Sequence, residues 1–491
     1  MAFGVKSQET VVTRVEENTQ IEVDPIDGGG WAKSVATSTS TGNIYWGYIG
    51  PSNEGMVMKI EPDGTTSTHQ VMSDVPNDNS HAEISIAVDN DGYIHWIGGQ
   101  HNNAPNYYRS TNAEDITSWE ELDSDYANGG LQGERITYQQ FFRSKNGTLF
   151  IMYRNNLRNI HSYWGMRTLL LAKYSTTDKK WTMIGGYDYC TQSDGYYCGE
   201  KCGGDYYDII AFAWNNSAVG NGYGEGNCVS RDHYQGYIGD IVFDDDNGMH
   251  VTYNLADSIN VDYGANPRVV SKSMTHVFYA YSPDEGDTWY KADSSQINTF
   301  PITKASGDLV YERCPDGYTF PDLNTEFNMS NAANIFMDTN GDPVIYQKAF
   351  DSGNNQVNKF FRWNGSQWAD ISNNYHMSDG GDVYTNLSRG EMYYFAFGGI
   401  FQLSNDNMAT YVSYDDLMTS STFYGMDEYY LMKEGGLRYV ERSGNNAQIV
   451  TLKIEDGVAR PVISPNEIIQ AGGIDVSLST ETSGASMRYT V

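Results

Sequence analysis

The sequence of 491 residues predicts an all-β fold, organised as a β-propeller. Three observations lead to this prediction: the composition, a repeated strand-and-turn unit, and one Asp-box motif. Aromatic residues make up 13% of the chain, and it contains 38 Tyr and 50 Gly. Strands are enriched in aromatic residues and turns in glycine, so this composition favours strands and turns over helices.

The repeated unit is an Asp/Asn-Gly turn followed by a run of β-branched and aromatic residues. Copies occupy residues 89–96, 145–153, 246–253 and 339–346, with a fainter copy at 41–46. Each lies next to another strand-like run, such as 84–88 or 238–243. Two such runs joined by a glycine turn predict a β-hairpin.

The Asp-box motif S-x-D-x-G-x-T-W occurs at residues 282–289, with degenerate relatives at 175–181 and 363–368. We expect Ser282 and Asp284 to bond the turn backbone and Trp289 to pack between blades. Unrelated hairpins in a β-sandwich are the plainer alternative, but recurrence of both units favours a propeller. Blades that bury one another explain how residues 1–491 can form a single domain. The Gly-, Tyr- and Cys-rich stretch at 187–228 is interpreted as an insertion.

The net charge limits the choice of partner. Lys and Arg total 31 against 63 Asp and Glu, a formal net charge of −32. Such a surface repels phosphates, so binding to nucleic acid or a membrane surface is not expected. No run approaches the roughly 18 apolar residues that span a bilayer. The polar N-terminus shows no secretory signal, so the protein is either cytoplasmic or the mature form of a secreted protein, and we expect the second. An anionic ligand would need a site that is a local exception to the overall charge.

Two neighbouring hairpins carry a set of residues suited to catalysis. His81 precedes the strand run 84–88 and His101 follows the run 93–97, so the hairpin should bring both imidazoles to one rim. Tyr138 and Arg154 flank the next hairpin in the same way. Each residue alone is more often a packing or surface residue. The matched spacing of all four favours a functional site at one end of adjacent blades.

The segments 81–95, 101–103, 137–141, 153–154 and 232–240 resemble the propeller-type ulvan lyases, polysaccharide lyase family 25 or the related family 24. The resemblance is clear over residues 80–255 and weak elsewhere. It implies a seven-bladed propeller secreted by marine bacteria. It also implies cleavage of ulvan, a sulfated uronic-acid polysaccharide, by β-elimination between rhamnose 3-sulfate and the uronic acid, which leaves an unsaturated uronate end. Tyr234 matches a substrate-contacting position of that family. We expect a monomer.

The residue types fit β-elimination, which removes the uronate C5 proton and expels the 4-linked oxygen. Arg154 is suited to bind the carboxylate and stabilise the enolate-like intermediate, with His101 as a second donor. His81, with a reference pKa of about 6.5, is suited to be the base. Tyr138, with a reference pKa of about 10, is better suited to be the acid that protonates the leaving oxygen. The division between His81 and Tyr138 stays open.

Further candidates extend the expected substrate site. Asn102 beside His101 is a candidate substrate contact, as are Arg143 and Arg158, and His161 is a weaker one. We expect the cationic groups to gather at one rim, within a largely acidic shell. In a salty medium, screening over about 8 Å or less weakens the repulsion between that shell and an anionic polysaccharide.

Four cysteines, Cys190, Cys198, Cys202 and Cys228, lie within the insertion or at its edges and are followed by His233. Their spacing permits a tetrahedral zinc site or one or two disulfides. The resemblance implies a structural zinc, with either Cys190 or His233 completing it. Acidic turns such as 244–248 could bind calcium but are more often plain turns. No organic cofactor is expected.

Two other functions remain open. A sialidase-like glycoside hydrolase would need an arginine triad, and the Phe-Arg-Ile-Pro opening typical of sialidases is not evident. A non-catalytic carbohydrate-binding propeller would use the aromatic residues for sugar stacking, and His81 and His101 would then be incidental.

Overall fold

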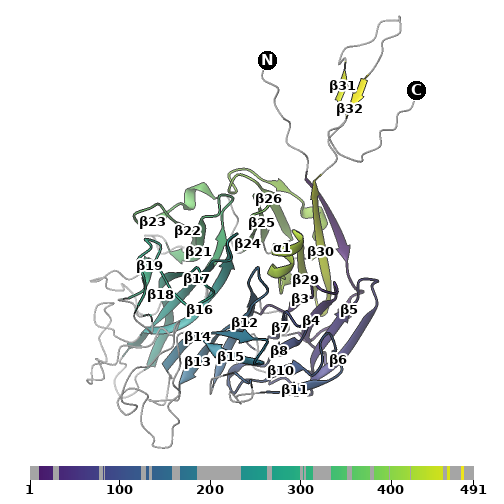
Figure 1. Ribbon diagram of the computed structural model, residues 1–491. Helices are drawn as coiled ribbons and strands as arrows, with labels where there is room; N and C mark the ends of the chain where they lie inside the picture. Colours follow the sequence, from purple (N-terminus) through teal and green to yellow (C-terminus); the bar gives the residue numbers. More distant parts are fainter. Residues whose placement is uncertain are drawn as a thin grey trace, which may run out of the picture.

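Figure 1 presents the computed structural model, in which β-sheets are arranged as a ring. The structure describes residues 10–456 apart from gaps at 26–31, 77–80, 82, 123–128, 132–134, 158–165, 185–233, 262–267, 299–301, 303–305, 313–332, 351–355, 376–380, 397–398 and 421, together with 462–464 and 477–479. Seven antiparallel sheets of four or five strands make seven blades, which confirms the predicted seven-bladed β-propeller.

The first three blades follow one another along the chain. Blade 1 contains β3 (Val35–Thr37), β4 (Ile44–Ile49), β5 (Gly55–Ile60) and β6 (Thr66–Met72). Blade 2 contains β7 (Ser85–Val88), β8 (Ile94–Ile97), β10 (Tyr107–Ser110) and β11 (Trp119–Glu121). Blade 3 contains β12 (Ile136–Arg143), β13 (Leu149–Leu157), β14 (Met166–Ser175) and β15 (Lys180–Met183), and β9 (His101–Asn103) pairs with the free edge of β12.

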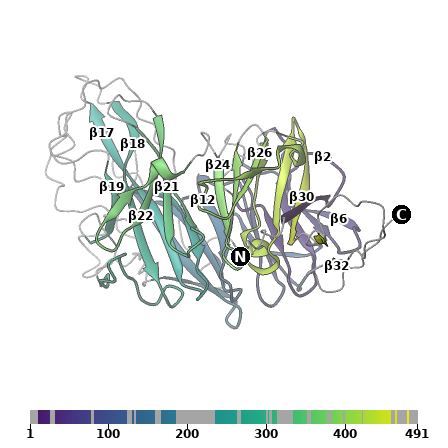
Figure 2. The ribbon, with the colours of Figure 1, turned by 90° about the horizontal axis from the view of Figure 1, so that it is seen from above.

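The next three blades repeat the pattern. Blade 4 contains β16 (Tyr234–Phe243), β17 (Met249–Val261), β18 (Arg268–Ser282) and β19 (Asp308–Glu312). At 13 and 15 residues, β17 and β18 extend beyond neighbouring strands (Figure 2). Blade 5 contains β20 (Asn334–Met337), β21 (Pro343–Phe350), β22 (Gln356–Trp363) and β23 (Trp368–Asp370). Blade 6 contains β24 (Gly381–Asn386), β25 (Glu391–Ala396), β26 (Ile400–Ser404) and β27 (Val412–Ser413).

Blade 7 closes the ring by joining the two ends of the chain. It contains β28 (Thr422–Tyr424), β29 (Leu437–Ser443) and β30 (Asn446–Asp456), and β1 (Thr10–Glu16) pairs with β30 in antiparallel register. β2 (Ile21–Glu22) also pairs with β30. An ion pair from Arg14 to the buried Glu441, 2.5 Å long, ties β1 to β29. A two-stranded sheet of β31 (Val462–Ser464) and β32 (Ser477–Ser479) lies outside the seven blades.

The Asp-Gly turns are held by their first aspartate. One carboxylate oxygen of Asp89 accepts the backbone N–H groups of Asp91 and Tyr93, and the other lies 3.3 Å from His95 Nε2. Asp244 accepts backbone N–H groups in the same way and lies 3.1 Å from His250 Nε2. The predicted turns are therefore present, and both histidines belong to the frame that supports them. The turn at 244–248 uses the Asp244 carboxylate for its own hydrogen bonds.

The Asp-box forms the expected contacts. Ser282 Oγ accepts the N–H of Gly286 at 2.7 Å, and Asp284 accepts the N–H of Thr288 at 2.7 Å. The Trp289 indole donates to the Gly286 carbonyl, and the ring is 1% exposed. Trp289 lies in the core cluster between blades 3 and 4, as predicted.

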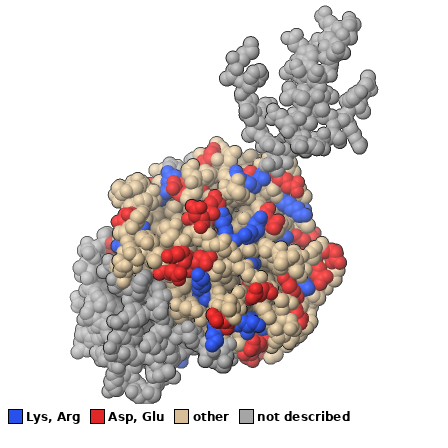
Figure 3. Space-filling model, viewed as in Figure 1, with Lys and Arg blue, Asp and Glu red and all other residues tan. Residues whose placement is uncertain are grey.

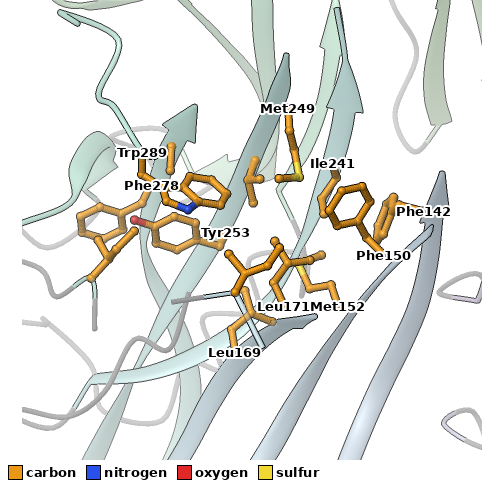
Figure 4. Packing of buried hydrophobic residues seen from close by; sticks show 14 of the residues in the cluster. Phe142, Phe150, Met152, Leu169, Leu171, Ile241, Met249, Tyr253, Phe278 and Trp289 are labelled. Atoms are coloured by element: carbon orange, nitrogen blue, oxygen red, sulfur yellow. The ribbon is translucent and has the colours of Figure 1, made fainter. Parts of the chain in front are cut away.

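The largest described core cluster joins blades 3 and 4 (Figure 4). Blade 3 contributes Phe142, Phe150, Met152, Leu169 and Leu171, which alternate along their strands and so lie on one face of the sheet. Blade 4 covers them with Ile241, Met249, Tyr253 and Phe278. Each blade thus buries the face of its neighbour, and no single oversized core is needed.

A short helix, α1 (Glu428–Glu434), closes the centre of the ring beside a cavity of about 110 Å³. Asp427 caps its N-terminus by accepting the N–H of Tyr430, and Gly435 at φ 74° ends it. Inside the channel, Lys33 forms an ion pair with Glu428 and lies 3.8 Å from Asp240. The cavity is lined by inner strands from blades 1 to 6 and by α1.

The surface carries charges of both signs. On the face shown in Figure 3, acidic and basic side chains of the described residues are interspersed. Within the part of the chain that the structure describes, no helix is long and apolar enough to cross a membrane.

Candidate active site

The candidate site lies where the innermost strands of blades 2 and 3 begin. His81 precedes β7, and His101 begins β9, which crosses to blade 3 and pairs with β12 opposite Thr137. The two imidazoles stack with their centroids 4.2 Å apart and their planes 5° from parallel. The sequence predicts this proximity from the ends of one hairpin, whereas the structure achieves it through β9, on the edge of the next blade.

Tyr138 stands at an irregularity in β12. The register between β12 and β13 shifts between Thr137 and Gln140, and Tyr138 has a φ of 60°. A bulky residue in the left-handed region costs on the order of 1–3 kcal/mol and is held only where its surroundings enforce it. The bulge turns the ring so that its hydroxyl lies 3.1 Å from His81 Nε2.

Arg154 approaches the same tyrosine. It lies on β13 opposite Thr137 and is 2% exposed. Its guanidinium carbon lies 4.6 Å from the centroid of the Tyr138 ring, a cation–π contact. The structure therefore brings His81, His101, Tyr138 and Arg154 together, with Tyr138 contacting both His81 and Arg154.

The stacked imidazoles place two rings with proton-donor and proton-acceptor nitrogens next to the Tyr138 hydroxyl. A neutral imidazole nitrogen at this place can accept a proton.

Asn102 is held beside the pair in a strained conformation, with a φ of 62°. Its backbone N–H donates to Thr137 Oγ1 at 3.1 Å, and the threonine hydroxyl lies 3.4 Å from Asn102 Oδ1. Thr137 is fully buried. It therefore fixes β9, and with it His101, against β12. This role of Thr137 could not be predicted, because nothing in the sequence pattern shows that β9 leaves its own hairpin.

Arg143 lies away from the other four. It is the last residue of β12, donates to the carbonyl of Thr37 at 3.2 Å, and stacks at 3.6 Å on the ring of Tyr429 in α1. Burial lowers the pKa of its guanidinium from the usual value, while the nearby Tyr429 and Asp427 oppose this. Arg143 thus supports the central helix, and the structure does not bring it to the histidines.

The side chains of the remaining candidates lie outside the described residues. Tyr234 begins β16 at the same end of blade 4, but its side chain lies outside the described residues. Arg158, His161, Cys190, Cys198, Cys202, Cys228 and His233 also lie outside them. Within the described residues no cluster of three or more His, Cys, Asp or Glu is arranged to hold a metal ion. The residues expected to bind zinc all lie outside the described part of the chain.

Comparisons with known proteins agree with the architecture. The model of the BNR repeat-containing family matches residues 43–374. A solved structure of a polysaccharide lyase family 25 ulvan lyase bound to -[GlcA(1-4)Rha3S]- is 14% identical with a TM-score of 0.55, covering 89% of this chain and 95% of that one. The polysaccharide lyase Uly1 is 14% identical with a TM-score of 0.57, covering 87% of this chain and 90% of that one. No curated protein matches the chain by sequence. At this identity the two lyases share the fold with this chain.

Proposed function

The chain belongs to the BNR repeat-containing family, and we propose that it is a polysaccharide lyase that cleaves ulvan by β-elimination at the uronic acid linked to rhamnose 3-sulfate. The observation that carries the proposal is the contact set around Tyr138. Its hydroxyl lies 3.1 Å from His81, its ring lies 4.6 Å from the Arg154 guanidinium, and His81 stacks on His101. The fold shared with ulvan lyases supports the choice of substrate.

In the proposed reaction, His81 accepts the C5 proton of the uronate and Tyr138 donates its proton to the 4-linked oxygen. The C5–H and C4–O bonds break, and a C4–C5 double bond forms. The proton on His81 then passes to the Tyr138 oxygen across their hydrogen bond, which restores both groups. The 3.1 Å contact therefore closes the proton cycle without an external donor.

The depth of Arg154 refines its expected role. At 2% exposure beside the Tyr138 ring, it places a permanent positive charge where the phenolate develops. His101 and Asn102 are partly exposed and are better placed to contact the substrate carboxylate. Arg154 thus supplies a permanent positive charge at this rim, within an otherwise acidic protein.

The test is incubation with ulvan while the ultraviolet absorbance of an unsaturated uronate is followed. A lyase produces this absorbance, a hydrolase produces reducing ends without it, and a carbohydrate-binding propeller produces neither. Tyr138→Phe should remove the absorbance, because the phenyl ring cannot donate a proton. Tyr108→Phe is the matched control, since the Tyr108 hydroxyl contacts the exposed Glu121 on the outer part of blade 2. Near-normal activity of Tyr138→Phe would exclude Tyr138 as the acid.

We also propose a structural zinc bound by cysteines of the segment 190–228, with Cys190 or His233 completing the site. Metal analysis of the purified protein should give about one zinc per chain. Thiol titration of the unfolded protein without reductant separates the alternatives, because zinc ligands react as free thiols and disulfides do not.

A further inference from the structure

A second pocket, of about 430 Å³, opens between blades 4 and 5. Its walls include His250, directly after the turn from β16 to β17, and Asp342, in the turn from β20 to β21. Both turns follow the ends of innermost strands, whereas Tyr138 lies near the start of β12. The pocket is therefore on the opposite face of the propeller from the histidines. β12 has 8 residues, and a strand of that length spans roughly 25 Å.

Five of the eleven residues that line the pocket carry an aromatic or imidazole ring. Tyr281, Tyr290 and Trp363 are partly exposed in it, and Tyr279 and His250 lie deeper. A volume of about 430 Å³ is in the range of natural small-molecule sites, which are typically about 300–1,000 Å³. Partly exposed aromatic rings that gather around one hollow indicate a binding surface.

The rings are held in place before any ligand arrives. Tyr281 and Tyr290 flank the Asp-box and exchange two backbone hydrogen bonds of 2.9 and 2.8 Å. The Tyr281 ring also lies 4.7 Å from the imidazole of His250. Trp363 pairs edge-on with Trp368 across β22 and β23 at 5.9 Å. Because these side chains are already ordered, binding would cost little of their conformational entropy.

The charges of the pocket favour an uncharged ligand. Lys291 lies in the electrostatic field of Asp293 and Asp308, and His250 lies 3.1 Å from Asp244. Lys291 therefore has carboxylates beside it, and His250 is already engaged in a hydrogen bond with Asp244. Asp342 adds an exposed negative charge, which would repel a uronate or a sulfate.

We propose that this pocket is a non-catalytic binding site for uncharged sugar units of a polysaccharide. The electron-rich faces of aromatic rings attract the weakly positive C–H groups of a pyranose face. Asp342, Ser294 and the tyrosine hydroxyls can hydrogen-bond the sugar hydroxyls at the rim. The site would hold a polymer on the face away from the histidines. Sugar binding at this pocket would not depend on which bond the protein cleaves.

The test is calorimetric titration with uncharged hexasaccharides of glucose, xylose, mannose and rhamnose, and with carboxyl-reduced, desulfated ulvan. At least one should bind the wild type, with an affinity that changes little between low and high NaCl. Trp363→Ala and Tyr290→Ala should each weaken binding at least tenfold. Trp363→Ala also removes packing on Trp368, so its loss of binding could come from unfolding. Tyr290→Ala tests the pocket without that change. Tyr411→Ala, an exposed tyrosine near β27, is the matched control.

Tyr138→Phe should bind these sugars as the wild type does, which separates this site from the proposed active site. The proposal is wrong if no uncharged probe binds. It is equally wrong if binding survives both ring substitutions, or if only sulfated or uronate-containing probes bind, with a strong dependence on salt.

Discussion

The hydroxyl of Tyr138 lies 3.1 Å from Nε2 of His81, while His101 stacks 4.2 Å from the same imidazole. His81 therefore has a proton donor or acceptor at its edge and a second titratable ring against its face. A positive charge placed at position 101 should make His81 accept a proton less readily, because like charges at this distance repel.

This coupling predicts the pH dependence of lyase activity in variants of His101. His101→Lys places a permanent positive charge beside His81 and disfavours its protonated form. We expect the acidic limb of kcat/KM to move to lower pH by about one unit, equivalent to about 1.4 kcal/mol. His101→Gln, which stays uncharged, is the control and should shift the limb much less. Identical acidic limbs in the two variants would show that His81 is not the base.

The Arg154 side chain gives a second prediction. Arg154→Met keeps much of the buried volume but removes the charge beside the Tyr138 ring. Because that charge acts mainly on the developing phenolate, kcat should fall by about 10²–10³-fold with a smaller change in KM. Arg154→Lys keeps the charge and should retain more activity than Arg154→Met. A melting temperature for each variant separates this effect from unfolding, and a rise in KM alone would instead assign Arg154 to substrate binding.

The sequence predicted the propeller and the proximity of four residues, but not the local details of the fold. The four residues could be grouped because hairpin ends converge at one rim of a propeller. For the same reason the sequence pattern placed Arg143 at the rim of Tyr138. Arg143 comes five residues after Tyr138 along β12, and because a strand rises about 3.3 Å per residue, it lies near the opposite face of the propeller. The left-handed φ of Tyr138 leaves no sequence signal, because tyrosine does not favour that conformation.

The central helix was also not predicted, for a physical reason. α1 has 7 residues, two turns, too few for a helical periodicity to stand out. Its stability comes from the Asp427 cap and from contacts with the inner strands. Those contacts exist only once the ring has closed.

A hidden Asp-box in blade 6 gives a third prediction. Ser404 Oγ accepts the N–H of Met408 at 2.9 Å, and Asp406 accepts the N–H of Thr410 at 2.8 Å, as in the motif at 282–289. The sequence pattern misses it because Met408, at φ 62°, stands where the motif has glycine.

Asp406→Ala and Asp284→Ala should therefore destabilise the protein to a similar extent. Each removes an acceptor of a backbone N–H and a threonine hydroxyl, which costs about 1–3 kcal/mol. Asp416→Ala, at an exposed position of the same blade, should have little effect. Urea unfolding measures all three. If Asp406→Ala resembled Asp416→Ala, the blade 6 turn would not share the function of the Asp-box.

The last prediction concerns Asp240 in the central channel. Burial raises its pKa to about 7, although Lys33, 3.8 Å away, opposes the rise and Glu428 adds to it. In the unfolded chain an aspartate ionises near its usual pKa of 3.8. At a pH between these two pKa values, Asp240 is ionised in the unfolded chain but keeps its proton in the folded protein. The contribution of Asp240 to stability is therefore complete below about pH 4 and is lost as the pH rises toward 7.

Asp240→Asn removes this linkage while keeping a side chain of the same shape. The difference in free energy of unfolding between the variant and the wild type should increase in favour of the variant as the pH rises from 4 to 7. The increase should be about 1.4 kcal/mol for each unit by which folding raises the pKa of Asp240. Urea unfolding at several pH values measures the difference. Asp91→Asn, at an exposed turn, should leave the pH dependence unchanged. A variant that lost stability relative to the wild type over this range would mean that Asp240 is ionised in the folded protein and paired with Lys33.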